Sequence, residues 1–451
     1  MYEADQGSLS IALAGDTIPT RRLSVYREER FLRIREILSA ADAAFTNLEA
    51  PIHRYLDGGH AQRPGGGTYM TTEPALLEDL KWLGLNMVAC GSSHADDYGP
   101  DGILQTIEYM EAAEIAHAGS GRNLAEARSP AFLDTPRGRI ALVAASAHHS
   151  DSARAGEQRR DTPGFPGVNG VRHRTVHWVS QASLGGIVEA SKSLGWHAEL
   201  ARRGALGDPG TADGEASYNF LGHIFAVAEE PAIKTYPDQA DLESNLRQIE
   251  YAKASADRVI VSLHCHEQGG PTFKTAARRS GVEDLADFAV TFAHRAIEAG
   301  ADVFVAHGPQ AQLGIEIYQG RPIFYGLGIF IFQLETVRYL PEEAYERYGL
   351  GIDATPFDFS NTRYAGDTRG HPADPLQWEQ AFFECDFTSQ GLAEIRVHPI
   401  ELGFGRPRWQ RGRPMIASPA AAERVLDRIT DISKKYGTVI DRRSGIGVIH
   451  P

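Results

Sequence analysis

Acidic and imidazole side chains follow several separate predicted strands of this chain, each at the point where the strand ends. They are Asp16, Glu49, His94, His264 with His266, and His307. Carboxylate oxygens and imidazole nitrogens are together the ligands that Zn, Mn and Fe(II) take in proteins. Two such ions can activate a water molecule and stabilise a developing anion. The pattern therefore predicts a site for one or two divalent transition metal ions and a hydrolytic reaction.

Each of these residues also has a purely structural interpretation. An aspartate after a strand, such as Asp16, is often a helix N-cap or a turn former. His94 on its own could be a loop histidine that hydrogen-bonds a carbonyl. His264 and His266 lie two positions apart, which places both imidazoles on one face of a strand, but such a pair can be incidental. The joint pattern, with every member at a strand end, favours the metal site.

Alternating strands and helices predict an α/β fold that would bring these residues together. Strands are expected at 9–15, 43–50, 86–90, 140–146, 258–263, 302–306, 315–318 and 322–328, and helices at 27–40, 75–84, 101–113, 241–255 and 283–299. This order is typical of a mainly parallel sheet covered by helices. All strands of such a sheet end at one edge, and ligands bind outside that edge.

Two segments depart from this alternation. Residues 150–240 are rich in Gly, Pro, Arg, His and Asp, with predicted helices at 181–194 and 216–228. We expect them to form an insertion or cap that selects the substrate. Residues 336–451, with a predicted strand at 393–398 and a helix at 418–435, are expected to form a C-terminal extension that packs on the main domain of residues 1–335.

Composition narrows the class of protein. The chain has 451 residues, 42% of them hydrophobic, and a formal net charge of −14. This acidic balance argues against nucleic acid or an anionic membrane as partner. Three widely separated cysteines predict no disulfide framework. The sequence shows no signal peptide and no apolar run long enough to span a membrane, so we expect a cytoplasmic protein, with a homo-oligomer left open.

Seven short motifs occur in an order that resembles one protein family. They are Gly15-Asp16, Asn47-Leu48-Glu49, Ser92-Ser93-His94 with Asp97-Tyr98-Gly99, residues 118–127, Ser262-Leu263-His264, Ala306-His307-Gly308-Pro309-Gln310, and residues 322–330. The segments 9–146 and 245–332 thereby resemble the CapA family. That family is named for poly-γ-glutamate capsule synthesis and belongs to the calcineurin-like metallophosphoesterase superfamily.

The resemblance implies a fold and a set of roles. The fold is a metallophosphatase-like sandwich of two sheets flanked by helices. The implied metal ligands are Asp16, Glu49, His264, His266 and His307. His94 is placed beside the metal as general acid or transition-state stabiliser, oriented by Asp96 or Asp97. Glu267 would hold a ligand histidine or act as a base.

Three residues depart from the family pattern. Ser93 stands where the family has Asn, Gln310 where it has His, and Ile329 where it has Asn. Serine and glutamine are weaker ligands than the family's residues. The site is therefore expected to hold one ion firmly, or two with altered affinity. Ser93 and Gln310, with Arg63 in a Gly-rich loop, are expected to contact the substrate.

The sequence leaves three classes of function. We favour a metal-dependent hydrolase that acts on an amide-type or related small-molecule or oligomeric substrate, with a phosphoesterase as the alternative. The second class is a poly-γ-glutamate capsule assembly protein, which the lack of a membrane anchor disfavours. The third class is a non-catalytic binding protein, which the retained histidines and carboxylates disfavour. The family link to a polymer is an analogy, because a fold does not fix a function.

Overall fold

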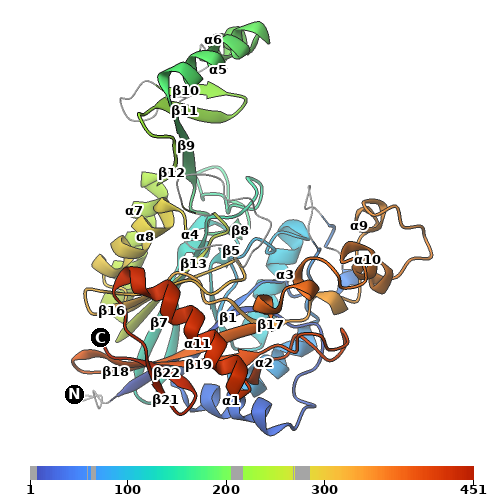
Figure 1. Cartoon of the computed structure of the whole chain (residues 1–451), viewed down its shortest axis with the longest axis vertical. Coiled ribbons are helices and arrows are strands. Elements are labelled where there is room, and N and C mark those ends of the chain that lie inside the picture. Colours follow the sequence, from blue (N-terminus) through green and yellow to red (C-terminus); the bar gives the residue numbers. More distant parts are fainter. Residues whose placement is uncertain (1–7, 58, 62–67, 205–216, 268, 270–284) are drawn as a thin grey trace.

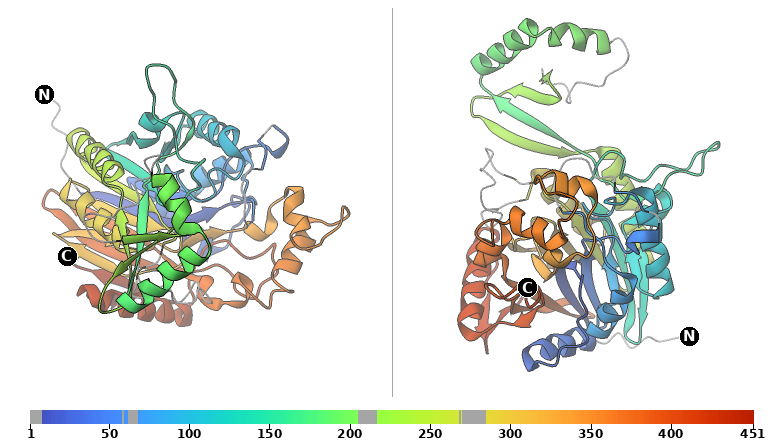
Figure 2. Two further views of the ribbon diagram at one scale, coloured as in Figure 1. Left: turned by 90° about the horizontal axis from the view of Figure 1, so that it is seen from above. Right: turned by 90° about the vertical axis from the view of Figure 1, so that its right-hand side faces the viewer.

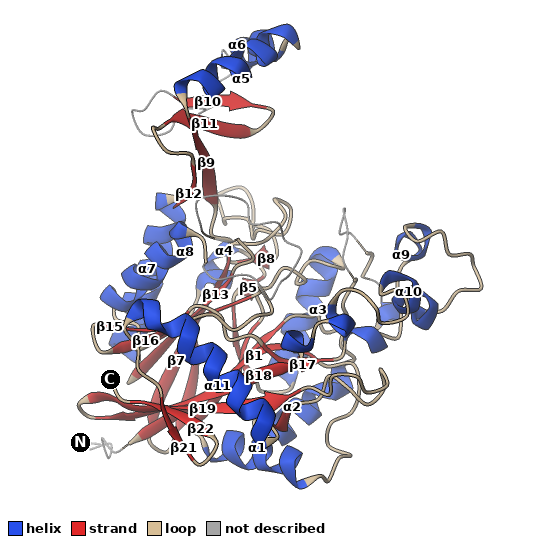
Figure 3. Cartoon of the chain, viewed as in Figure 1, coloured by secondary structure: helices blue, strands red, loops and turns tan. Residues whose placement is uncertain are grey.

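Two β-sheets pack face to face, and helices cover the outer face of each sheet (Figure 1 and Figure 3). The computed structural model describes residues 8–57, 59–61, 68–204, 217–267, 269 and 285–451, and the structural statements below concern these residues. The predicted α/β sandwich of two sheets flanked by helices is confirmed.

The first sheet contains ten of the described strands. Its order is β21-β22-β19-β18-β1-β2-β3-β4, with β17 beside β1 and β20 beside β19. The neighbours β17, β1, β2, β3 and β4 are parallel, whereas β18, β19 and β22 continue the sheet antiparallel. The bounds are β1 (Leu9–Ile18), β2 (Ala43–Leu48), β3 (Met87–Ala89), β4 (Ala116–Ala118), β17 (Ile329–Phe332), β18 (Glu379–Thr388), β19 (Gly391–Glu401), β20 (Met415–Ile416), β21 (Asp441–Arg443) and β22 (Ile446–Ile449).

The second sheet has the order β15-β16-β14-β13-β7-β6. Its middle strands β16, β14, β13 and β7 are parallel, and β15 and β6 are antiparallel to their neighbours. The bounds are β6 (Ala131–Thr135), β7 (Gly138–Ser146), β13 (Arg258–His264), β14 (Val303–His307), β15 (Ile315–Tyr318) and β16 (Arg321–Phe324). The short strands β5 (Ser120–Gly121) and β8 (Gly167–Val168) pair separately.

The hydrophobic core lies in three layers, because successive side chains of a strand point to opposite faces. Ile11 and Leu13 of β1 point between the sheets and pack in one cluster with Leu142 of β7. Ala12 of β1 points outward and shares a cluster with Phe31 of helix α1 (Glu29–Ala40). The strands that carry the candidate ligands are therefore buried on both faces and rigidly held.

Helices follow the strands in the positions that the hydrophobic spacing predicts. In α8 (Asp287–Glu298), Phe288, Phe292 and Ala296 recur every fourth residue and are fully buried against the second sheet. In addition to α1 and α8, the described α-helices are α2 (Leu77–Leu83), α3 (Gly99–Ala112), α4 (Leu124–Arg128), α5 (Gln181–Ser193), α6 (Trp196–Gly204), α7 (Gln239–Ser255), α9 (Glu342–Glu346), α10 (Pro356–Arg363) and α11 (Pro419–Ser433).

Part of the segment 150–240 forms a projection that we call the arm, residues 173–237. It is a separate four-stranded sheet of order β10-β11-β9-β12, accompanied by α5 and α6. Figure 1 and Figure 2 show it standing away from the sandwich, with α5 and α6 at its outer end. The bounds are β9 (His173–Val179), β10 (Ser217–Phe220), β11 (His223–Val227) and β12 (Ala232–Pro237). The base of the arm rests on α8, where the Phe288 amide donates a hydrogen bond to Thr235 Oγ1 (3.1 Å).

Two differences from the sequence predictions concern these outer segments. The predicted helix at 216–228 is wrong, because β10 and β11 form a hairpin there. Leu221 and Gly222 both have positive φ (51° and 86°), as a two-residue hairpin turn requires. The C-terminal segment contributes β18, which pairs with β1 from Leu9↔Phe387 to Leu13↔Phe383. It thus extends the first sheet at the very strand that carries Asp16.

Candidate metal centre

The candidate ligands come from four strands, two in each sheet, all near the carboxyl ends of those strands. Asp16 lies in β1, at a break in the pairing of β1 with β17 and with β2. Glu49 directly follows β2. His264 and His307 are the last residues of β13 and β14 and are paired in register. Gly15 permits this arrangement, since a Cβ there would lie 2.1 Å from the Gly328 carbonyl oxygen.

Five of the predicted residues converge on one buried cluster. His264 Nδ1 lies 3.2 Å from His307 Nδ1, and His264 Nε2 lies 3.0 Å from His266 Nε2. Asp16 Oδ1 is 3.8 Å from His307 Nδ1, and Glu49 Oε1 is 3.9 Å from His266 Nε2. The donor atoms form two groups that could hold an ion, Asp16-His264-His307 and Glu49-His264-His266. His264 belongs to both groups, with Nδ1 near His307 and Nε2 near His266.

The chemistry of this donor set fits a divalent transition metal. Carboxylate and imidazole donors lie within 4.8 Å of one another in each group. Asn47 adds a further observation: its Nδ2 donates to Asp16 Oδ1 (2.8 Å), while its buried Oδ1 has no hydrogen-bond partner among the described residues. A buried amide oxygen without a partner is costly, and a nearby cation would satisfy it. Sequence reasoning quoted Asn47 only as part of a motif and did not assign it a role.

Burial changes the pKa values of the cluster in opposite directions for acid and base. Desolvation raises the pKa of Asp16 to about 7, although hydrogen bonds from Asn47 and the Gly308 amide act against the rise. Desolvation lowers the pKa of His307 to about 3. Burial first, and then the neighbouring imidazoles, lower the pKa of His264 well below its usual value. Both histidines are therefore neutral at pH 7, with lone pairs available to a metal.

His94 lies beside the cluster, held by a carboxylate. Its Nδ1 is 2.7 Å from Asp97 Oδ2, and the same oxygen accepts a hydrogen bond from the Met70 amide (2.7 Å). Asp97 is buried and the His94 side chain is 13% exposed. Of the two aspartates considered, Asp97 contacts the ring, whereas Asp96 Oδ2 accepts a hydrogen bond from Ser150 Oγ (2.7 Å). The carboxylate thereby fixes the orientation of the ring.

Glu267 pairs with a histidine that the sequence analysis did not select. Its Oε1 lies 2.8 Å from His148 Nδ1, and the His148 ring centroid is 4.5 Å from that of His266. Burial alone would raise the pKa of Glu267, but the hydrogen bond and charge of His148 outweigh it and lower the pKa to about 2. His148 follows the end of β7. The criterion used for the other histidines, a position just after a predicted strand, would have found His148 as well.

Of the three residues predicted to contact the substrate, the structure describes Gln310 and Ser93. Gln310 Nε2 donates to Glu49 Oε2 (3.3 Å) from a residue with φ of 58°, so this side chain reaches the cluster. Ser93 is buried, and its Oγ has no hydrogen-bond partner among the described residues. Arg63 lies outside the described residues. Ile329 pairs with Asp16 across β17 and β1, but its side chain packs in the core beneath the helices of the first sheet.

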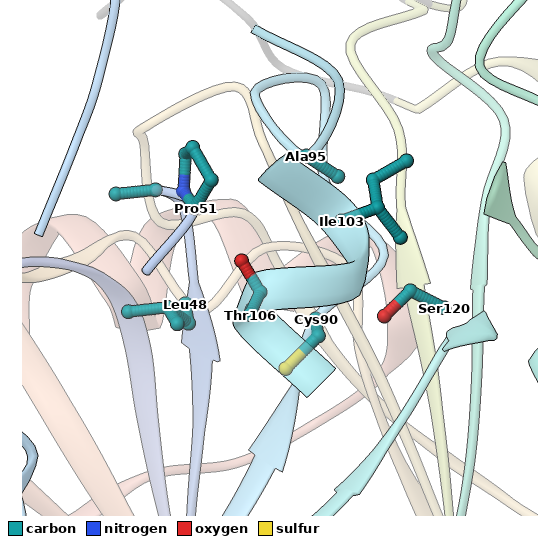
Figure 4. A pocket seen from close by; sticks show the side chains of 8 residues that line it. Leu48, Pro51, Cys90, Ala95, Ile103, Thr106 and Ser120 are labelled. Carbon is teal, nitrogen blue, oxygen red and sulfur yellow. The ribbon is translucent and has the colours of Figure 1, made fainter. Parts of the chain in front are cut away.

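A small cavity lies next to the loop that carries His94. Figure 4 shows side chains that line it. The cavity has a volume of about 10 Å³ and is lined by Leu48, Ala50, Pro51, Cys90, Ala95, Ile103, Thr106 and Ser120. It has room for about one water molecule. It is therefore too small to receive a substrate, and the cluster of ligands remains the candidate site.

Comparison with known proteins identifies the family of this chain. Residues 10–334 match the family model described as "Bacterial capsule synthesis protein PGA_cap". The chain belongs to this family. The resemblance to CapA proteins is thereby confirmed.

Relatives of this PGA_cap family member extend over much of the chain. "Uncharacterized protein y4sH" of Sinorhizobium fredii is 30% identical over 98% of this chain and 92% of its own length. A "Probable polyglutamine synthesis accessory protein" of Mycobacterium tuberculosis is 25% identical over 66% of this chain and 58% of its own. "PGA biosynthesis protein CapA" of Bacillus subtilis is 21% identical over 78% and 71%. Among the described residues, no helix of this chain is long and apolar enough to cross a membrane.

Proposed function

We propose that this chain is a metal-dependent hydrolase whose substrate carries an amide-type bond. The observation that carries the proposal is the convergence of Asp16, Glu49, His264, His266 and His307 at the carboxyl ends of strands from both sheets. A buried cluster of carboxylates and neutral imidazoles is the arrangement of donor groups that a catalytic metal ion needs.

The chain's own residues would hold and supplement the metal. Asp16, His264 and His307 would form one coordination group, and Glu49, His264 and His266 would form the alternative group. A neutral His264 has a lone pair on only one ring nitrogen, so it would serve one of the two groups at a time. The metal would supply Lewis acidity, which activates a water molecule near neutral pH. Asn47 would keep Asp16 in place through its hydrogen bond (2.8 Å).

His94 would act on the substrate from beside the ligands. Asp97 holds Nδ1 of the ring at 2.7 Å, so Nε2 is the atom that would meet the reacting group. From that position the ring would transfer a proton to the leaving group or stabilise charge in the transition state. Its role as a ligand is disfavoured, since the two coordination groups are made without it.

The substrate class rests on the relatives. Proteins named for polyglutamine synthesis and for PGA and capsule biosynthesis share this family. We infer a substrate with an amide bond, a small molecule or an oligomer, rather than a phosphoester. The phosphoesterase remains the second candidate because the site resembles that of metallophosphoesterases.

The test combines metal analysis with two chromogenic probes. Protein purified without chelator would be loaded with Mn, Zn or Fe(II), and hydrolysis of γ-glutamyl-4-nitroanilide and of bis(4-nitrophenyl) phosphate measured. The Asp16→Asn variant, which removes one ligand charge, is the matched control. The proposal is supported if the wild-type protein hydrolyses the anilide and the Asp16→Asn variant does not. Turnover of the phosphate alone points to the phosphoesterase, and metal-loaded protein inert to both contradicts a hydrolase.

A further inference from the structure

His148 meets the candidate site because of strand register. β7 and β13 are parallel neighbours with Ser146 paired to His264, and the Ala147 amide donates to the His264 carbonyl oxygen (2.8 Å). The chain beyond β7 therefore continues alongside the ligand histidines. It brings the ring of His148 against that of His266, with centroids 4.5 Å apart.

Two histidine–carboxylate pairs thus flank the ligands, one from each sheet. His94 follows β3 of the first sheet and is held by Asp97, while His148 follows β7 of the second sheet and is held by Glu267. In both pairs a carboxylate oxygen takes Nδ1, at 2.7 and 2.8 Å.

The loops that carry the two histidines are joined to each other. Ser150, two residues after His148, donates from Oγ to Oδ2 of Asp96, two residues after His94 (2.7 Å). Arg154 in the same loop as Ser150 is anchored by an ion pair to the buried Asp241 (2.8 Å). The position of His148 relative to His94 is therefore fixed by the fold, as a binding group requires.

The bond to Glu267 decides what His148 can do. A carboxylate oxygen only accepts, so in the neutral ring Nδ1 donates and Nε2 carries the lone pair. The His148 side chain is 44% exposed, and among the described residues no protein group hydrogen-bonds its Nε2. An acceptor at this place suits a substrate with an N–H next to its reacting carbonyl. A phosphodiester has no such donor.

We propose that His148 Nε2 accepts a hydrogen bond from the N–H of an amide substrate, so that His148 selects amides over esters and phosphodiesters. This inference rests on the proposed function, because the substrate must lie over the metal cluster for the contact to form. Glu267 is a positioning residue in this account, since it acts by orienting His148. The substrate would then lie between His94 and His148.

Binding of two small hydroxamates tests the contact without any turnover. Acetohydroxamic acid and N-methylacetohydroxamic acid both chelate metals, but only the first carries an N–H. Their dissociation constants for the Zn-loaded protein would be measured by calorimetry at pH 8, where an ordinary imidazole is neutral. We expect the wild-type protein to bind the N–H form about 10-fold more tightly, the effect of roughly one hydrogen bond.

The variants separate this contact from general effects. His148→Ala should bring the two dissociation constants together, whereas His148→Gln, which retains an acceptor oxygen, should keep part of the preference. The control is His294→Ala: His294 also pairs with a glutamate, Glu316 (3.0 Å), and lies on α8. It should keep the full preference of the wild-type protein.

Each remaining outcome has a distinct meaning. An equal preference in the wild-type protein and His148→Ala, with metal content unchanged, overturns the inference and leaves the proposed function standing. Loss of the metal in His148→Ala also overturns it, because His148 would then be a ligand or a support for His266. Failure of the wild-type protein to bind any transition metal removes the proposed function, and the inference with it.

Discussion

His264 and His307 occupy paired positions at the ends of the adjacent strands β13 and β14, and their Nδ1 atoms lie 3.2 Å apart. Parallel register places any two such strand-terminal residues side by side, whatever their separation in sequence. Two buried imidazoles at this distance cannot both be charged, and burial lowers the pKa of each. The fold thus produces a pair of neutral nitrogen donors that face one another.

The first prediction concerns metal content. Protein purified without chelator is expected to contain near-stoichiometric Zn, Mn or Fe, because two donor groups of carboxylate and imidazole lie ready in the folded chain. At a free metal concentration of about 100 times Kd, binding should raise the free energy of unfolding by about 2.7 kcal/mol. Elemental analysis and calorimetric unfolding with and without metal measure both effects. No metal and no stabilisation would contradict a metal site.

The second prediction concerns protons released on metal binding. The pKa of Asp16 is raised to about 7 by burial, so its carboxyl is largely protonated at pH 6 and largely ionised at pH 8. His307, with a pKa of about 3, is neutral at both values. Metal binding should therefore release about one proton at pH 6 and close to none at pH 8. Calorimetry in buffers of different ionisation enthalpy measures this number, and Asp16→Asn should abolish the difference.

The same pKa shifts predict how the metal-free protein responds to pH. The pKa of Asp16 is raised on folding, so its contribution to stability is present below pH about 4 and lost as the pH rises through about 7. The pKa of His307 is lowered, so its contribution is present above pH about 6.5 and lost as the pH falls toward 3. Between about pH 4 and pH 6.5 the two contributions change in opposite directions and nearly cancel, so the free energy of unfolding should differ little between pH 4 and pH 6. Denaturant unfolding at these two values checks this, because His307→Gln removes one of the two contributions and should be less stable at pH 6 than at pH 4.

The sequence predicts the strands of the sandwich better than it predicts the outer segments. In the strand Arg258–His264, all residues between the first and the last are apolar except Ser262, because both faces of the strand are buried. β18 was missed, although it pairs with β1, because its run Glu379–Thr388 mixes charged with aromatic residues and lies far from its partner in sequence. His148 was missed because it lies two residues beyond the predicted strand 140–146, in a short stretch to which no role was assigned. Its link to Glu267 spans 119 residues, which no local pattern reveals.

The third prediction separates catalysis from metal binding at His94. His94→Ala should keep the metal content of the wild-type protein, because the two donor groups are made without this residue. Its turnover of the probe substrate should fall by about 10²- to 10⁴-fold, the usual contribution of a general acid or base. Asp97→Asn, which alters the hydrogen bond at Nδ1, should show a smaller loss of turnover. If His94→Ala loses metal as well, then His94 is a ligand.

The fourth prediction concerns Gln310. Its Nε2 donates to Glu49 Oε2 (3.3 Å), and an amide is a weaker ligand than the histidine that stands here in the family pattern. We expect one tightly bound and one loosely bound ion, and Gln310→His should raise the affinity for the second. Calorimetric titration with Mn or Zn measures both affinities. Two equally tight ions, unchanged by the substitution, would place Gln310 outside the coordination groups.

The fifth prediction concerns the arm. Val176 and Lys234 are paired across β9 and β12, so an Asn-Gly turn can replace residues 177–233 without moving the base of the arm. Thr235 and its hydrogen bond from the Phe288 amide remain in this variant. The sandwich and its ligands lie in other sheets, so metal content and thermal stability of the sandwich should be retained. We expect turnover of a γ-glutamyl oligomer to be lost, because the expected role of the arm is to select the substrate.

A small probe provides the control for that deletion, because it needs only the groups around the metal. Hydrolysis of γ-glutamyl-4-nitroanilide should persist in the shortened chain while the long substrate is no longer used. Equal loss of both activities would mean that the arm supports the site itself. Unchanged activity on the long substrate would show instead that the arm has no part in selecting it.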